Sequence, residues 1–93
     1  MDDQFGPKGV FLLRSIEKEL NSMAPAIADG SAGAGGQWTL NYIFMELSRA
    51  ATESCRAVES YDDGAPMPAE VRTAVASTLH AASNVLGALT QRR

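Results

Sequence analysis

Side chains suited to covalent or metal chemistry are scarce in this sequence, which has one cysteine, Cys55, and one histidine, His80. An internal disulfide needs two cysteines, and a zinc site needs several cysteines or histidines at short spacing. Neither feature is therefore predicted. The lone cysteine, together with Asp2 and Asp3 where a secretory signal would carry lysine or arginine, predicts a cytoplasmic protein.

Runs of one charge are also missing. The chain has eight basic and eleven acidic residues, a formal net charge of −3, and its only adjacent basic pair is Arg92 and Arg93 at the end. Binding to phosphates needs several convergent lysines or arginines. We therefore expect no nucleic acid partner.

No stretch of eighteen mostly apolar residues is present. The segment from Thr73 to Gln91 is free of formal charge, but its Ser, Thr, Asn, Gln and His content argues against a membrane span. An alternating pattern of any length is absent as well, which makes strands a poor expectation. The sequence predicts neither a membrane partner nor a sheet.

What remains is a chain of 93 residues that is 45% hydrophobic and contains two breaks, at residues 30–36 and 62–67. The first break is glycine-rich and the second combines glycine with proline, so both are predicted linkers. The rest predicts one domain, residues 1–93, with helices at about 8–24, 38–61 and 68–91. The expected fold is all-α, a three-helix bundle or an open helical array completed by homodimerisation.

Each predicted helix has one apolar face, recognised by spacings of three and four residues. In the first helix the face comprises Leu13, Ile16, Leu20, Met23 and Ile27, and Pro25 is expected to kink or end the helix. In the second it comprises Leu40, Ile43, Phe44, Leu47, Ala51, Cys55, Val58 and Tyr61. In the third it comprises Val71, Val75, Leu79, Ala82, Leu86 and Leu89.

The first and third predicted helices each have a second surface that is able to meet a partner. Val10, Phe11 and Leu12 add more apolar surface to the first helix than one stripe can hold, and the excess is expected to meet a partner. On the third helix the reverse face is small and neutral, a composition that lets another helix approach closely. Its residues are Thr73, Ala76, His80, Ser83, Asn84 and Gly87.

Candidate catalytic groups do not converge in the sequence. Cys55 with His80 as its base is the one nucleophilic pair available, but Cys55 falls on the predicted core face and is expected to be buried. The glutamates all fall outside the predicted core faces and are interpreted as solvated helix surface, with Glu53 spaced to pair with Arg49 or Arg56. No catalytic residue, no metal ligand and no cofactor is predicted, and the chain is not expected to be an enzyme.

The predicted contact strip is formed by Trp38, Tyr42, Met45 and Arg49, at spacings of four, three and four on the far side of the second helix. Trp, Tyr, Met and Arg are enriched at protein interfaces. The alternative is that Trp38 and Tyr42 pack under the linker or against the first helix. If the strip is exposed, a two-fold homodimer is the simplest way to cover it.

Three functions follow as hypotheses. The first is a non-enzymatic interaction module of the regulatory, inhibitor or adaptor type that binds a protein partner stoichiometrically. The second is a secretion-chaperone, an immunity-type protein or a subunit of a larger helical assembly. The third is a ligand-binding or cysteine-dependent enzyme domain that uses Cys55 and His80.

Overall fold

The computed structural model describes residues 6–30, 38–61 and 66–91, and within these ranges the only regular elements are three helices. They are α1 (Pro7–Ala28), α2 (Leu40–Glu59) and α3 (Ala69–Gln91). The prediction of an all-α, three-helix fold is confirmed. Most of the two predicted linkers, residues 31–36 and 62–65, lies outside the described residues.

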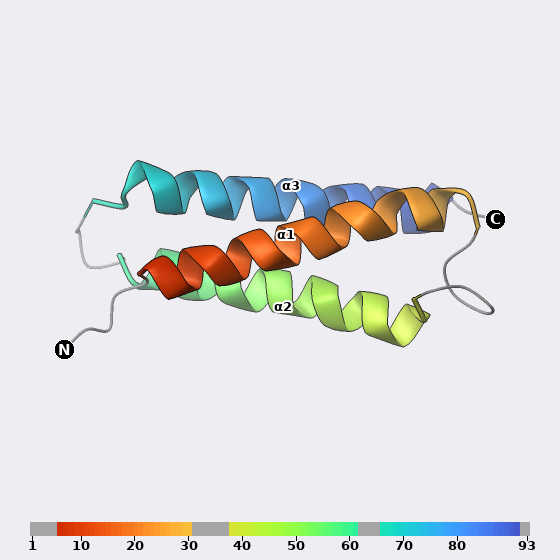
Figure 1. The fold of residues 1–93 in the computed structure, drawn as a ribbon, viewed down its shortest axis with the longest axis horizontal. Coiled ribbons are helices and arrows are strands. Elements are labelled where there is room, and N and C mark those ends of the chain that lie inside the picture. Colours follow the sequence, from red (N-terminus) through yellow and green to blue (C-terminus); the bar gives the residue numbers. More distant parts are fainter. Residues whose placement is uncertain (1–5, 31–37, 62–65, 92–93) are drawn as a thin grey trace.

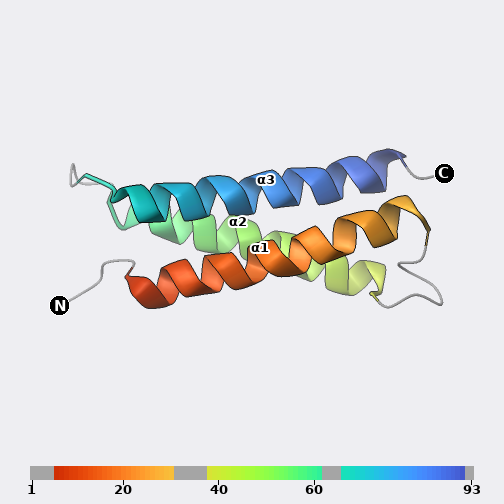
Figure 2. The same cartoon turned by 45° about the horizontal axis from the view of Figure 1, so that its top comes forward.

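The helices run side by side with alternating directions. Figure 1 shows α1 in front, between α3 above and α2 below, and in Figure 2, after the 45° turn, α1 lies below α3 with α2 behind them. All three pairs of helices are in contact, with α1 and α3 packed most extensively. α1 thus covers one side of the layer formed by α2 and α3.

Helix α1 continues through Pro25 to Ala28, so the prediction that it ends near residue 24 is wrong. Pro25 is exposed on the side away from the core, where the carbonyl that loses its amide partner can bond to water. Ile27, one turn later than the predicted end, is fully buried. Asp29 and Gly30 close the helix by donating to the carbonyls of Pro25 and Ile27, and Gly30 adopts φ 84°, which a glycine tolerates.

The other helix starts follow ordinary capping rules. Thr39 caps α2, because its hydroxyl accepts a hydrogen bond of 3.1 Å from the backbone N–H of Tyr42. At α3 the carbonyl of Pro68 accepts from the N–H of Arg72, and Glu70 lies in the first turn, where the helix dipole favours a negative charge.

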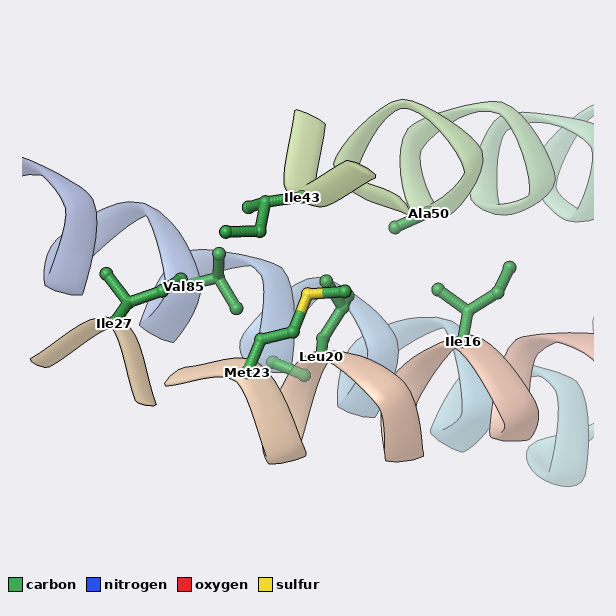
Figure 3. Packing of buried hydrophobic residues seen from close by; sticks show 8 residues of the cluster. Ile16, Leu20, Met23, Ile27, Ile43, Ala50 and Val85 are labelled. Carbon is green, nitrogen blue, oxygen red and sulfur yellow. The ribbon is translucent and has the colours of Figure 1, made fainter. Parts of the chain in front are cut away.

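The core is built asymmetrically, from large side chains on α1 and small ones on α2 and α3. All five residues of the predicted α1 stripe are buried, which confirms that prediction. Figure 3 shows Leu20, Met23 and Ile27 of α1 beside Ile43 and Val85 from the two other helices. Elsewhere the partners of α1 are mostly alanine, serine and threonine. They include Ala50, Ser54 and Ala57 on α2, and Ala74, Thr78 and Ala81 on α3.

The predicted core face of α2 is wrong for most of its members. The buried residues are Ile43, Glu46, Ala50, Ser54 and Ala57. Ile43 alone of the predicted set is fully buried, while Leu47 and Tyr61 are partly buried and Leu40, Phe44, Ala51, Cys55 and Val58 are exposed. At 100° per residue the observed face is turned by roughly 80° from the predicted one. The small residues of this face pack against α1 and α3, and the larger apolar side chains of α2 lie outside.

The same correction applies to α3. Val71 and Val75 are buried as predicted, but Leu79 and Leu86 are about half exposed, and Ala82 and Leu89 are only partly buried. Ala74, Thr78, Ala81 and Val85 occupy the core instead. This face is turned by roughly 60° from the predicted one by the same arithmetic.

Two buried polar groups on these helices find partners. The hydroxyl of Thr78, which is fully buried, donates a hydrogen bond of 3.0 Å to the carbonyl oxygen of Leu13 and so joins α3 to α1. Glu46 is 3% exposed, contrary to the expectation that every glutamate is solvated, and its carboxylate accepts from Arg49 at 3.0 Å. The ion pair explains how the carboxylate is tolerated there.

Candidate interaction surface

The exposed large apolar side chains gather on α2 and α3. Five of them are about half exposed and form what we name the α2–α3 face: Leu40, Phe44 and Val58 on α2, and Leu79 and Leu86 on α3. Leu47, Ala82 and Leu89 are partly buried beneath this face. Phe11, which is 72% exposed on α1, and Met45 stand apart from it.

On α2 the exposed residues point away from α1. Taking the buried Ile43 as the reference direction and about 100° per residue, Leu40, Phe44 and Val58 lie about 60° to 100° round the helix in one sense. Tyr42, which bonds to Glu19 of α1, lies about 100° round in the opposite sense by the same arithmetic. The apolar side of α2 is therefore the side that α1 does not cover.

The exposed residues of α3 point the same way. With the buried Thr78 as reference, Leu79 and Leu86 lie about 80° to 100° round in one sense. Asn84 and Ala88 lie about 80° to 120° round in the other, and these two line a shallow open groove shared with α1. Both helices thus leave their uncovered leucines, and the phenylalanine, on the side of the bundle opposite α1.

The predicted contact strip is divided by the structure. Trp38 is partly buried against the core, and its indole Nε1 donates to Glu19 Oε2 at 3.3 Å. The hydroxyl of Tyr42 donates to the same oxygen at 3.0 Å. These contacts correspond to the alternative in which Trp38 and Tyr42 pack against the first helix. Of the four residues of the strip, Met45 and Arg49 are the two that remain exposed without a described hydrogen bond to α1.

The shared carboxylate affects the acidity of Tyr42. Its phenol donates a hydrogen bond to Glu19, and that bond, with lesser contributions from partial burial and from the negative charge itself, raises the pKa of Tyr42 above its ordinary value. The phenol therefore stays protonated as a donor throughout the neutral range. The hydrogen bond from Tyr42 to Glu19 joins α2 to α1.

Cys55 is exposed, so the prediction that it is buried is wrong. Because the buried face of α2 is turned by roughly 80° from the predicted one, Cys55 lies outside the core. Its thiol donates to Glu59 Oε2 at 3.5 Å, and this hydrogen bond, together with the carboxylate charge, raises the thiol pKa. His80 is exposed on α3, and none of the described hydrogen bonds joins it to Cys55. A raised pKa keeps the thiol in its less nucleophilic, protonated form.

The remaining carboxylates form local ion pairs. Glu53 pairs with Arg56 at 2.7 Å and Glu17 with Arg14 at 3.2 Å, each within one turn of helix, while Arg49 pairs with Glu46 and not with Glu53. Within residues 6–30, 38–61 and 66–91, no three His, Cys, Asp or Glu side chains come together as a metal site would need.

None of the three described helices combines the length and the apolar character that a bilayer crossing demands. Comparison with protein-family models, with curated proteins and with solved structures finds no match.

Sequence reasoning found the residues of the α2–α3 face but assigned them to the core. The spacing of Leu40, Phe44, Leu79 and Leu86 correctly shows that each lies on an apolar face. What the spacing omits is the second, smaller face of alanine, serine and threonine beside it. Each helix therefore has two surfaces able to pack, and the pattern signals only the larger one.

Proposed function

We propose that this chain is a non-enzymatic interaction module that binds a protein partner stoichiometrically through the α2–α3 face. The single observation that carries the proposal is the position of five large apolar side chains, half exposed and on one uncovered side of two adjacent helices. Single exposed apolar residues are ordinary on a protein surface, but a contiguous group marks a contact site. Regulatory, inhibitor and adaptor proteins act through such contacts.

The α2–α3 face is preferred to the strip of Trp38, Tyr42, Met45 and Arg49. Trp38 and Tyr42 already contact Glu19, and Arg49 already pairs with Glu46, so binding through the strip would compete with these interactions. Leu79 and Leu86 carry no polar group that must give up a bond. Covering them removes apolar surface from water at a gain of about 25 cal/mol per Å².

The proposal that the chain is not an enzyme rests on Cys55. The thiol is the one strong nucleophile of the sequence, and its hydrogen bond to Glu59 opposes ionisation. A cysteine nucleophile is normally activated by a base or a positive charge, which lowers its pKa. The environment of Cys55 acts in the opposite direction.

The test compares two glutamate substitutions on opposite sides of α2. Phe44→Glu puts a carboxylate in the α2–α3 face, and Met45→Glu puts one in the strip, at a residue of nearly equal exposure. Affinity-tagged wild-type protein and both variants are used to capture partners from native extract, with helicity checked by circular dichroism.

We expect Phe44→Glu to lose a chain that the wild type and Met45→Glu both retain. Loss with Met45→Glu alone would move the site to the strip and refute the α2–α3 face. Loss with neither variant would show that both surfaces are inactive.

A further inference from the structure

The charged residues that border the α2–α3 face lie at one end of it. Among the described residues of α2 and α3, Glu59 and Arg72 are the only charged side chains turned toward this side of the bundle. Glu59 lies at the end of α2, about 60° beyond Phe44 in the same sense and so on the outer edge of the face, where its carboxylate also accepts from Cys55. Arg72 lies about 20° from the direction of Leu79 on the first turns of α3. The other described charges of the two helices, which are Glu46, Arg49, Glu53, Arg56 and Glu70, lie on the α1 side or on the outer flank of α2.

Glu59 and Arg72 lie at the same height because the two helices are antiparallel. Ile43 and Val85 belong to one buried cluster, and Figure 3 shows their side chains in the same part of the bundle, so we take this pair as the reference for the register of α2 against α3. Counting back along both helices from that contact brings residue 59 to within about one turn of residue 72. One acidic and one basic side chain therefore stand on opposite edges of the face, at its end where α2 stops and α3 begins.

Resting on the proposed function, we propose that the partner of the α2–α3 face is a second copy of this chain, related by a two-fold axis parallel to the helices. In this arrangement α2 of each copy lies on α3 of the other. The same patch then meets itself, as two-fold symmetry requires, and four helices enclose a shared apolar centre.

The charges select this orientation. A two-fold axis along the helices keeps the charged ends together and sets Glu59 of each copy against Arg72 of the other, giving two ion pairs. An axis across the helices turns one copy end for end, so that Glu59 would face the end of the partner that carries Leu40. The parallel arrangement is electrically complementary, whereas the antiparallel one leaves four rim charges without an opposite charge.

The area is also appropriate. A large side chain exposes on the order of 200 Å² when it is fully accessible, so five that are half exposed offer roughly 500 Å² per copy. A stable interface of standard size needs about 800 Å² per partner, and the partly buried Leu47, Ala82 and Leu89, with the rim residues, add to the area of the five. Size matching helps as well. The small Ala51 lies at the height of Leu79, and the small Ala82 lies at the height of Leu47.

The experiment is a charge exchange followed by sedimentation equilibrium. Four proteins are compared with the wild type: Glu59→Arg, Arg72→Glu, the double exchange Glu59→Arg/Arg72→Glu, and Lys18→Glu. The last is the matched control, because it makes the same change of charge as Arg72→Glu on an exposed residue of α1, away from the face. Circular dichroism confirms that each variant keeps its helicity.

We expect the wild type to sediment as a dimer and each single exchange to raise the dimer dissociation constant roughly tenfold, since two rim pairs become repulsive at once. The double exchange restores the affinity, and Lys18→Glu leaves it unchanged. A dimer whose affinity neither single exchange alters would overturn the parallel arrangement.

A monomeric wild type would overturn the dimer, and a dye measurement then separates this failure from that of the proposed function. The probe is 8-anilinonaphthalene-1-sulfonate, which fluoresces on exposed apolar surface. A monomer whose dye signal disappears with Phe44→Glu, but not with Met45→Glu, excludes the second copy while leaving the face open to another protein. A monomer that binds no dye refutes both proposals.

Discussion

Ser54 is a buried residue whose hydroxyl has no hydrogen-bond partner in the described part of the chain. A buried hydroxyl without a partner costs free energy, and serine is also a weaker helix former than alanine. We expect Ser54→Ala to raise the free energy of unfolding by about 1 kcal/mol. Urea denaturation measures the change. Ser48→Ala, on an exposed turn of the same helix, provides the same gain in helix propensity alone, so an equal effect from both would contradict the argument.

Thr78 presents the opposite case, a buried hydroxyl that is satisfied. Its bond to the carbonyl of Leu13 joins α3 to α1 in the interior. Thr78→Val keeps the shape of the side chain and removes the bond, which should lower the unfolding free energy by about 1 kcal/mol. Thr73→Val, on the exposed face of α3, is the control and should be nearly neutral.

Tyr42 predicts a dependence of stability on alkaline pH. Because its pKa is raised in the folded state, by the hydrogen bond to Glu19 first of all, its contribution is complete below the unfolded pKa of about 10. The contribution is lost as the pH rises through the folded pKa. The difference in unfolding free energy between wild type and Tyr42→Phe should therefore be constant through the neutral range and shrink above about pH 10.

Absorbance titration of the phenolate provides the second measurement. The titration step present in the wild type and missing in Tyr42→Phe should move to lower pH in Glu19→Gln, which removes the negative charge beside the phenol. A difference in stability that grew above pH 10 would show that the phenol does not donate to Glu19.

At the level of the helix, Pro25 weakens α1 without ending it. The proline removes one amide donor from the last turns, and its exposed position lets water satisfy the carbonyl left over. Pro25→Ala should restore the bond and raise the unfolding free energy by about 1 kcal/mol, the gain being reduced by the greater freedom of the unfolded chain. Pro7→Ala should not stabilise, because a missing N–H in the first turn costs nothing.

The three helices differ in how far the sequence predicts their packing. α1 has one stripe of large apolar residues, from Leu13 to Ile27, and that stripe is the buried face. In α2 and α3 the strongest apolar pattern runs through Phe44 and Leu79, yet the buried face runs through Ala50 and Ala81. Periodicity reports where apolar side chains point, but it does not report which neighbour covers them.

The exposure of the α2–α3 face was not predicted from the sequence, for a related reason. An interface and a core have the same composition when the interface is apolar, so Phe44 and Leu86 could not be recognised as exposed before the bundle was assembled. The sequence predicts Trp38 and Tyr42 in a contact strip because aromatic residues are frequent at interfaces. Their hydrogen bonds to Glu19 join residues about twenty positions apart in the chain, and no local sequence pattern predicts such bonds.

For the whole molecule, the proposed parallel dimer predicts a specific cross-link. Cys55 is the only cysteine, and it lies on the outer edge of α2, which in the proposed dimer would face the first turns of α3 of the other copy. Arg72→Cys should therefore give, on mild oxidation, a disulfide-linked dimer visible on a non-reducing gel. The two sulfurs of one copy stand on opposite edges of the face.

Ser83→Cys is the control for this cross-link. It is an exposed residue of α3 that lines the groove shared with α1, and it lies about three turns further along the helix than Arg72, too far from Cys55 for a disulfide. A dimeric band of equal yield from both variants would indicate random collision, and a linked monomer from Arg72→Cys would show that the two edges close on each other within one copy.

Because the core is asymmetric, α2 and α3 each have an inner side that packs against α1 and an outer side that is exposed. Their alanine, serine and threonine side seats the large residues of α1, and their leucine and phenylalanine side remains outside. A substitution on the outer side can therefore change the surface of the bundle without changing its core. Under the proposed function, the outward leucines are free to be replaced in related sequences to suit another partner, while the size of the α1 side chains keeps the inward alanines in place.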